Sequence, residues 1–103
     1  MDRFVGIRAE SLEQARQRIE SATGIRGIKR EHDDMGGEYY EFPLPDGNDF
    51  VILRNLDLYE AVPFTDPKYA EWKFVAQFAE KARLDKWVDL LATGSAWFKE
   101  LRD

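Results

Sequence analysis

The sequence predicts an α+β domain in which two helices cover one face of a mostly antiparallel sheet. Three observations favour this class. A segment of strand character runs into a well-capped helix, turn-forming residues separate short alternating segments in the middle, and the last third repeats the layout of the first. At 103 residues, 44% of them hydrophobic, the chain has the size of one domain, which we place at residues 1–103.

The opening third is predicted to form a strand, a helix and a second strand. Residues 3–9 alternate in polarity, as a strand does. Ser11 and Gln14 have the spacing of a capping box, and Gly24 suits the left-handed position that ends a helix. The helix is therefore expected between Ser11 and Gly24, and residues 25–33 are expected to form the next strand.

The middle of the chain is predicted to form a hairpin. Residues 38–42 and 50–55 have strand character, and Pro, Asp, Gly and Asn between them supply turn chemistry. Residues 56–64 have mixed spacing, and Pro63 and Pro67 bound an expected surface connection.

Residues 68–82 fit either a helix or a strand. A shift of 70 residues decides between them, because it brings residues 3–31 onto residues 73–101 and aligns two Ala-Thr-Gly segments. The comparison favours a strand at 72–79, a helix at 83–93 and a final strand at 96–101.

The resulting order is β-α-β-β-β-α-β, which is typical of a ferredoxin-like sandwich with a hairpin inserted between two strand–helix–strand halves. Right-handed crossovers place both helices on the same side of the sheet. The other face of the sheet is then expected to be uncovered, and an open face of this kind suits binding or dimerisation.

The charge of the chain is unevenly distributed. The net charge is −5, and residues 31–66 hold ten acidic residues against a single basic one, Arg54. An acidic chain argues against direct nucleic-acid binding, which depends on cations that displace phosphate counterions. The absence of cysteine excludes disulfides and thiolate metal sites. No stretch approaches the roughly 20 apolar residues that a membrane helix requires, so we expect no membrane association and a cytoplasmic location.

Catalysis would have to start from His32, the single histidine, which lies between two acidic residues. A His32-dependent hydrolase needs a carboxylate to orient the imidazole, but adjacent strand residues point to opposite faces. Residues 46–49 lack the spacing of a calcium loop, and Gly36-Gly37 lacks the Lys-Ser/Thr of a phosphate loop. We therefore expect no enzyme and no metal or other cofactor.

Several aromatic side chains fit either a hydrophobic core or a ligand pocket. In a domain of this size such residues usually fill the core, so the core is favoured over the pocket. The residues concerned are Trp72, Phe74, Phe78, Trp87, Trp97 and Phe98.

The acidic middle of the chain is predicted to bind a basic protein partner, because aromatic residues among carboxylates combine contact area with electrostatic steering. The alternative is a solvated hairpin whose charge serves solubility. Of the successive strand residues Tyr39 and Tyr40, one is expected to face the core and the other the solvent. The expected contacts are Tyr40, as the anchor, and the steering charges Glu31, Asp33, Asp34, Glu38, Glu41, Asp57 and Glu60.

A capped helix that ends in glycine is followed here by Arg30-Glu31, Gly36-Gly37-Glu38-Tyr39-Tyr40 and Leu53-Arg54-Asn55. Over about residues 3–60, this layout resembles small bacterial immunity proteins of polymorphic and contact-dependent toxin systems. The resemblance implies a cytoplasmic, non-enzymatic inhibitor that binds and neutralises a cognate toxin domain, often a nuclease. The chain would act as a monomer or weak homodimer. The alternative is a ferredoxin-like small-molecule-binding or regulatory module that dimerises through its open sheet face.

Overall fold

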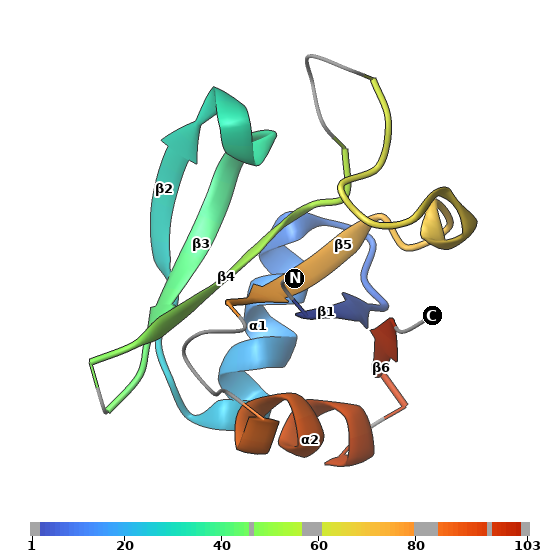
Figure 1. The fold of residues 1–103 in the computed structure, drawn as a ribbon. Coiled ribbons are helices and arrows are strands. Elements are labelled where there is room, and N and C mark those ends of the chain that lie inside the picture. Colours follow the sequence, from blue (N-terminus) through green and yellow to red (C-terminus); the bar gives the residue numbers. More distant parts are fainter. Residues whose placement is uncertain (1–2, 46, 57–60, 80–84, 95, 102–103) are drawn as a thin grey trace.

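Strands and helices alternate along the chain much as the sequence predicts. The computed structural model describes residues 3–45, 47–56, 61–79, 85–94 and 96–101. Its elements are, in order, β1 (Arg3–Ile7), α1 (Leu12–Thr23), β2 (Ile28–His32), η1 (Asp33–Met35), β3 (Gly37–Pro43), β4 (Asp49–Arg54), η2 (Pro67–Tyr69), β5 (Phe74–Phe78), α2 (Asp85–Gly94) and β6 (Phe98–Leu101), where η marks a 3₁₀ turn (Figure 1).

The strands form one sheet in the order β2-β3-β4-β5-β1-β6, and every neighbouring pair is antiparallel. The predicted α+β class is confirmed, whereas the ferredoxin-like strand order is not found. From β2 to β5 each strand pairs with the next one along the chain, so the hairpin lengthens one side of the sheet. The connection through α1 therefore passes three strands, whereas the connection through α2 passes one.

Helix α1 begins and ends as predicted. The Ser11 hydroxyl accepts the backbone N–H of Gln14 at 3.1 Å, and the Gln14 side chain accepts the N–H of Glu10 at 2.8 Å. Gly24 closes the helix in the left-handed conformation, at φ 73°. The first bond satisfies one free N–H of the first turn, and at the other end the N–H of Gly24 donates to the carbonyl of Glu20 at 2.8 Å.

The strand expected within residues 68–82 is present as β5. Asp66 and Pro67 do start a helical turn, in which Asp66 accepts the N–H of Lys68 at 3.0 Å, but η2 ends at Tyr69. Strand β5 is buried on both faces of the sheet, since four of its five residues are buried. Residues 80–82 lie outside the described residues.

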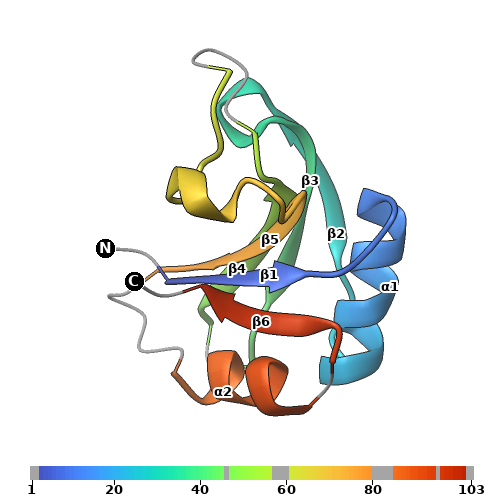
Figure 2. The same cartoon turned by 90° about the vertical axis from the view of Figure 1, so that its right-hand side faces the viewer.

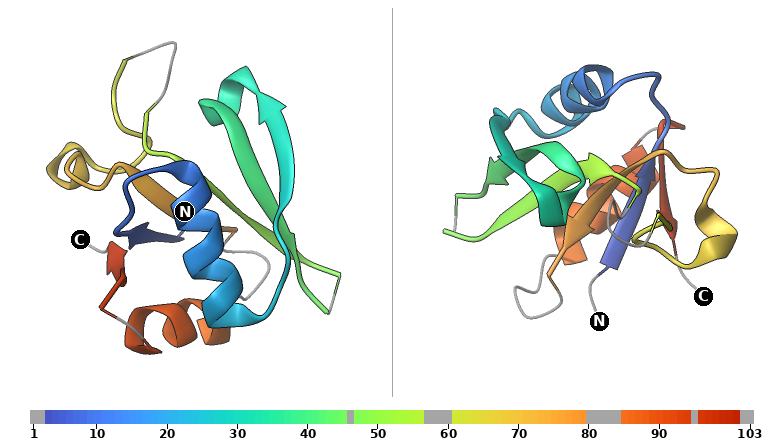
Figure 3. Two further views of the ribbon diagram at one scale, coloured as in Figure 1. Left: turned by 180° about the vertical axis from the view of Figure 1, so that it is seen from behind. Right: turned by 90° about the horizontal axis from the view of Figure 1, so that it is seen from above.

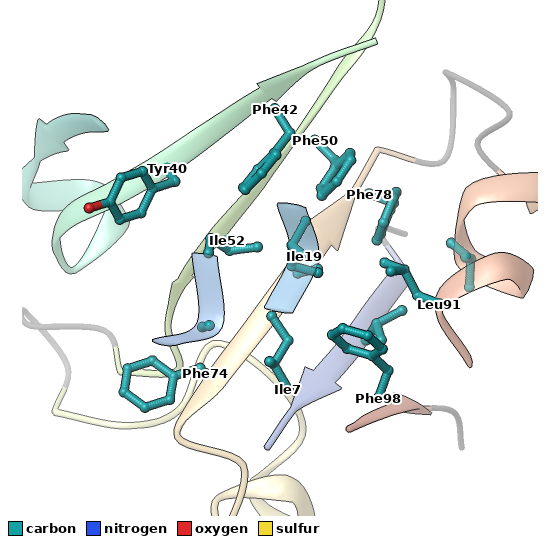
Figure 4. Packing of buried hydrophobic residues seen from close by; sticks show 14 of the residues in the cluster. Ile7, Ile19, Tyr40, Phe42, Phe50, Ile52, Phe74, Phe78, Leu91 and Phe98 are labelled. Carbon is teal, nitrogen blue, oxygen red and sulfur yellow. The ribbon is translucent and has the colours of Figure 1, made fainter. Parts of the chain in front are cut away.

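Both helices pack on one face of the sheet, over a core rich in aromatic rings. Phe50 is stacked between Phe42 and Phe78, with ring centroids 5.0 and 4.6 Å away (Figure 4). Of the aromatic residues assigned to the core from the sequence, Trp72, Phe74, Phe78 and Phe98 are buried and Trp87 is partly buried against the core. Trp97 is 48% exposed, and the guanidinium carbon of Arg18 lies 3.6 Å from the centroid of its ring.

The opposite face of the sheet is partly covered, contrary to the expectation of an open face. The segment that carries η2 crosses it on the side away from α1 (Figure 2). Trp72 packs there with Leu53, Val75 and Leu101 in a second buried cluster. The side chain of Asn55 fastens this segment, because it accepts the N–H of Thr65 at 3.1 Å and donates to its hydroxyl at 2.8 Å.

Candidate partner-binding surface

The predicted acidic contacts fall mainly on a projecting arm formed by β2, η1 and β3, residues 28–43, which we call the β2–β3 arm (Figures 1 and 3). Strand β2 lies at one edge of the sheet, and all five of its residues are exposed. Its register places Glu31 opposite Glu38 and His32 opposite Gly37. The arm therefore presents charged side chains on a strand that covers little of the core.

The turn at the end of the arm holds two carboxylates in solvent. The His32 ring accepts the N–H of Asp34 through Nδ1 at 3.1 Å, and the N–H of Gly36 donates to the carbonyl of Asp33 at 3.1 Å. Gly36 and Gly37 both have positive φ, 77° and 96°, a conformation that favours glycine and forms a tight bend here. Asp33 and Asp34 are exposed on this turn.

Gly36→Ala should lower the free energy of unfolding by about 1–2 kcal/mol, because a side chain at φ 77° is strained and its Cβ would lie 3.1 Å from the carbonyl oxygen of Leu56. Gly36→Asn adds the same Cβ but tolerates the left-handed conformation, and should lose less. Urea unfolding of the two variants distinguishes the cost of the left-handed backbone conformation from the cost of the close contact with the Leu56 carbonyl oxygen. Equal losses would mean that the contact, and not φ, sets the cost.

Two of the predicted steering charges are neutralised by the neighbouring strand. Glu38 forms an ion pair with Lys29 at 3.1 Å, and Glu41 forms one with Arg30 at 3.3 Å. The Glu38 carboxylate raises the pKa of Lys29 by hydrogen bonding. Arg54, the single base of residues 31–66, donates to the backbone carbonyl of Glu38 at 3.3 Å. The surface of the arm is therefore less acidic than the sequence count suggests.

Tyr40 does not fit its expected role as an anchor. Its side chain is 4% exposed and lies in the core beneath α1, where its hydroxyl donates to the carboxylate of Glu13 (Figure 4). Burial and this bond raise the pKa of Tyr40, and the same bond lowers the pKa of Glu13. Tyr39 faces the other side of the sheet and is partly buried against the second cluster. Strand alternation predicts one inward tyrosine but does not tell which one it is.

Asp49 is an acidic residue beside Glu41 that is not among the contacts predicted from the sequence. Asp49 lies near Glu41 on the β3–β4 hairpin, and burial together with a hydrogen bond to Glu41 raises the pKa of Asp49. The register of the hairpin, with Pro43 opposite Asp49, brings the two carboxyl groups together. The sequence shows that Asp49 follows the turn of the hairpin. It does not show that Glu41 is its partner, because that depends on the register between β3 and β4.

Three further predicted acids lie exposed within four consecutive residues at the tip of the arm. Glu31, Asp33 and Asp34 are all exposed, and within the described residues neither Glu31 nor Asp33 forms an ion pair. Asp34 Oδ2 lies 3.8 Å from His32 Nδ1, the nitrogen that accepts the backbone N–H of Asp34. Asp57 and Glu60 lie outside the described residues.

Two of the groups that a hydrolase could use accept hydrogen bonds from the backbone. His32 caps η1 through Nδ1, and the hydroxyl of Ser11 caps α1. Across the described ranges, no group of three histidine, aspartate or glutamate side chains is placed to hold a metal ion. In the same ranges, no helix is long and apolar enough to cross a membrane.

Two depressions lie away from the β2–β3 arm. One, of about 420 Å³, is lined by Arg8, Glu10, Glu71, Trp72 and Lys73, among others, and Arg8 lies 4.7 Å from the Trp72 ring. The other, of about 390 Å³, lies between α1 and β6 beside Trp97. The first depression is lined by charges of both signs, whereas Arg18 is the only charged residue among the described ones that line the second, and each contains a cation–π pair. Sequence spacing reveals neither arrangement.

The comparisons with known proteins give no relative from which a role could be transferred. No protein-family model matches the chain, and no match is found among curated proteins or among solved structures. The fold and the exposed acids at the tip of the arm therefore carry the functional argument alone.

Proposed function

We propose that this chain is a cytoplasmic, non-enzymatic immunity or antitoxin-like protein that binds and neutralises a basic toxin domain, such as a nuclease, through an acidic surface. The observation that carries the proposal is the exposed acidic group at the tip of the β2–β3 arm, formed by Glu31, Asp33 and Asp34. Glu38 and Glu41 flank this group but are already paired, so we assign them a secondary role.

The physical basis of the proposal is electrostatic complementarity. Nuclease clefts that bind phosphate carry clustered lysine and arginine side chains, so a compact acidic group is attracted to them over several ångströms. Oriented charge of this kind accelerates association, by roughly 10- to 1000-fold at low salt. The Gly36-Gly37 bend presents the carboxylates on a short, internally bonded turn, which limits the entropy lost on binding.

The alternative function, a module that dimerises through an open sheet face, has less support from the fold. The cluster around Trp72 covers part of the face that such a dimer would use. A small-molecule module would need an enclosed aromatic pocket, and most of the aromatic residues that were candidates for one are buried in the core.

Co-expression with a toxin domain tests the proposed function directly. The chain should restore growth to cells that produce its cognate toxin domain, which is to be sought as the toxic C-terminal domain of a large secreted protein encoded beside it. Reversing the charges at the tip of the arm, with Glu31→Lys, Asp33→Lys and Asp34→Lys together, should slow association with that domain by about 10- to 1000-fold.

A matched variant controls for net charge. Glu10→Lys, Glu71→Lys and Asp89→Lys change the charge of the chain equally, at exposed positions away from the tip. This variant should associate nearly as fast as the original chain. Equal slowing in both variants, measured by stopped-flow mixing over a salt series, would refute a localised acidic site. Absence of growth rescue would refute the immunity function.

A further inference from the structure

Strand β2 has a free edge. Among the described elements it pairs with β3 alone, and Figures 1 and 3 show no described element beyond it. The opposite edge strand, β6, is more protected, because Phe98 and Leu101 are buried. A free edge offers unpaired N–H and C=O groups that another strand can bind.

The side chains of β2 show which strand would fit. Glu31 lies directly opposite Glu38, and like charges in this position are destabilising. Within the described residues Lys29 forms an ion pair with Glu38, and Glu31 has no cationic partner. A cation delivered from the open side of β2, opposite Glu31, would balance the pair.

Lys29 of a second copy of β2 can supply that cation. When two β2 strands pair antiparallel about a two-fold axis at Arg30, Lys29 of each copy lies opposite Glu31 of the other. Shifting this register by two residues in either direction would place Lys29 opposite Lys29, or Glu31 opposite Glu31. Cross-strand charge therefore selects the register centred on Arg30.

The two arginines on the axis are compatible with this arrangement. Arg30 lies opposite Tyr39 in the β2–β3 register, on the other sheet face from Lys29 and Glu31. Each Arg30 forms an ion pair with Glu41 of its own chain at 3.3 Å, which offsets the repulsion between the two guanidinium groups.

We propose that the chain forms a homodimer by antiparallel pairing of β2 with β2 of a second copy, centred on Arg30. The pairing joins the two sheets into one, with α1 of both copies on the same face. This inference does not depend on the proposed toxin partner, and its test uses the purified chain alone.

Cysteine cross-linking tests the register. The chain has no cysteine, so Arg30→Cys introduces a single thiol on the proposed axis. Opposite residues of antiparallel strands have Cα atoms about 4.5–5.5 Å apart, which suits a disulfide. Lys29→Cys is the matched control, because its two copies would be diagonal neighbours about 7–8 Å apart, beyond easy bridging.

Under mild oxidation, Arg30→Cys should form a covalent dimer at least tenfold faster than Lys29→Cys. Equal rates, or no dimer from Arg30→Cys, would overturn the register. Sedimentation equilibrium of the unmodified chain from micromolar to millimolar concentration should show reversible dimerisation. A chain that stays monomeric throughout this range would overturn the proposal.

Charge exchange separates pairing from folding. Glu31→Lys places lysine opposite lysine in the proposed dimer and should weaken dimerisation by about tenfold or more, while relieving the like-charge contact with Glu38 within one copy. Adding Lys29→Glu to this variant restores opposite charges across the axis and should restore the dimer. Failure of this rescue, with thermal melting showing that both variants fold, would contradict the proposed pairing.

Discussion

Phe50→Ala should lower the free energy of unfolding by about 3–5 kcal/mol, the largest single-site loss that we expect. The Phe50 ring is 2% exposed and stacks on Phe42 on one side and Phe78 on the other. Its removal would leave a cavity bounded by two aromatic rings on neighbouring strands, which cannot collapse without shifting the sheet (Figure 4). Urea unfolding monitored by circular dichroism measures the loss.

Two controls show whether the stack itself is responsible. Phe50→Leu keeps most of the volume and should cost less than half as much as Phe50→Ala. Val51→Ala, one residue along β4, faces the other side of the sheet and is partly exposed, so its effect should be small. Similar losses for Phe50→Ala and Val51→Ala would contradict the packing described for this face.

Gly6→Ala should cost about 1–3 kcal/mol, although it adds one methyl group. A Cβ at this position would lie 2.5 Å from two carbon atoms of the Trp72 ring, a separation that forces the ring or the strand to move. Trp72 is 6% exposed and lies over Gly6 with Arg8 against its ring, so it has little room to move. The substitution therefore acts on the layer that covers the second sheet face.

A double-mutant cycle assigns the cost of Gly6→Ala to this contact. Trp72→Leu alone should destabilise by loss of buried area, but in its presence Gly6→Ala should become nearly neutral, because the clashing ring is absent. If the two losses simply add, the strain does not arise from Trp72. Gly24→Ala is a useful comparison, since no atom lies within 4 Å of its added Cβ and its cost comes from φ alone.

Local features of the fold were predictable from the sequence. The capping signals at Ser11 and Gly24 bound α1 because they act through bonds within a few residues. The alternation of β5 fitted a helix as well as a strand, and the 70-residue internal comparison decided for the strand that the structure contains. The helices and strands were therefore predicted to within a few residues at most described ends.

The strand order was not predictable in the same way. It depends on which edges meet after the chain has turned, and β1 pairs with β5 and β6, which are more than sixty residues away in the sequence. The covering of the second sheet face depends equally on distant contacts, since Trp72 packs on Gly6. The composition of the chain and the spacing of its residues predict neither the strand order nor the covering of the second sheet face.

The candidate site was predictable in composition but not in exposure. Counting charges located the acidic middle, and Glu31, Asp33 and Asp34 do lie together at one tip. The pairing of Glu38 and Glu41 with bases on β2 required the β2–β3 register, because each partner lies diagonally across the ladder. Tyr40 is expected from the sequence to be an exposed anchor, but it is buried. Strand alternation predicts that one of two adjacent tyrosines faces the core and does not tell which one.

The position of β1 between β5 and β6 has a consequence for how the chain folds as it leaves the ribosome. Strands β2, β3 and β4 each pair with the next strand along the chain and can assemble in the order of synthesis, whereas β1 must wait for both of its neighbours. Because β1 and β6 lie at opposite ends of the described chain, their pairing adds contacts of very long sequence separation, which are expected to slow folding.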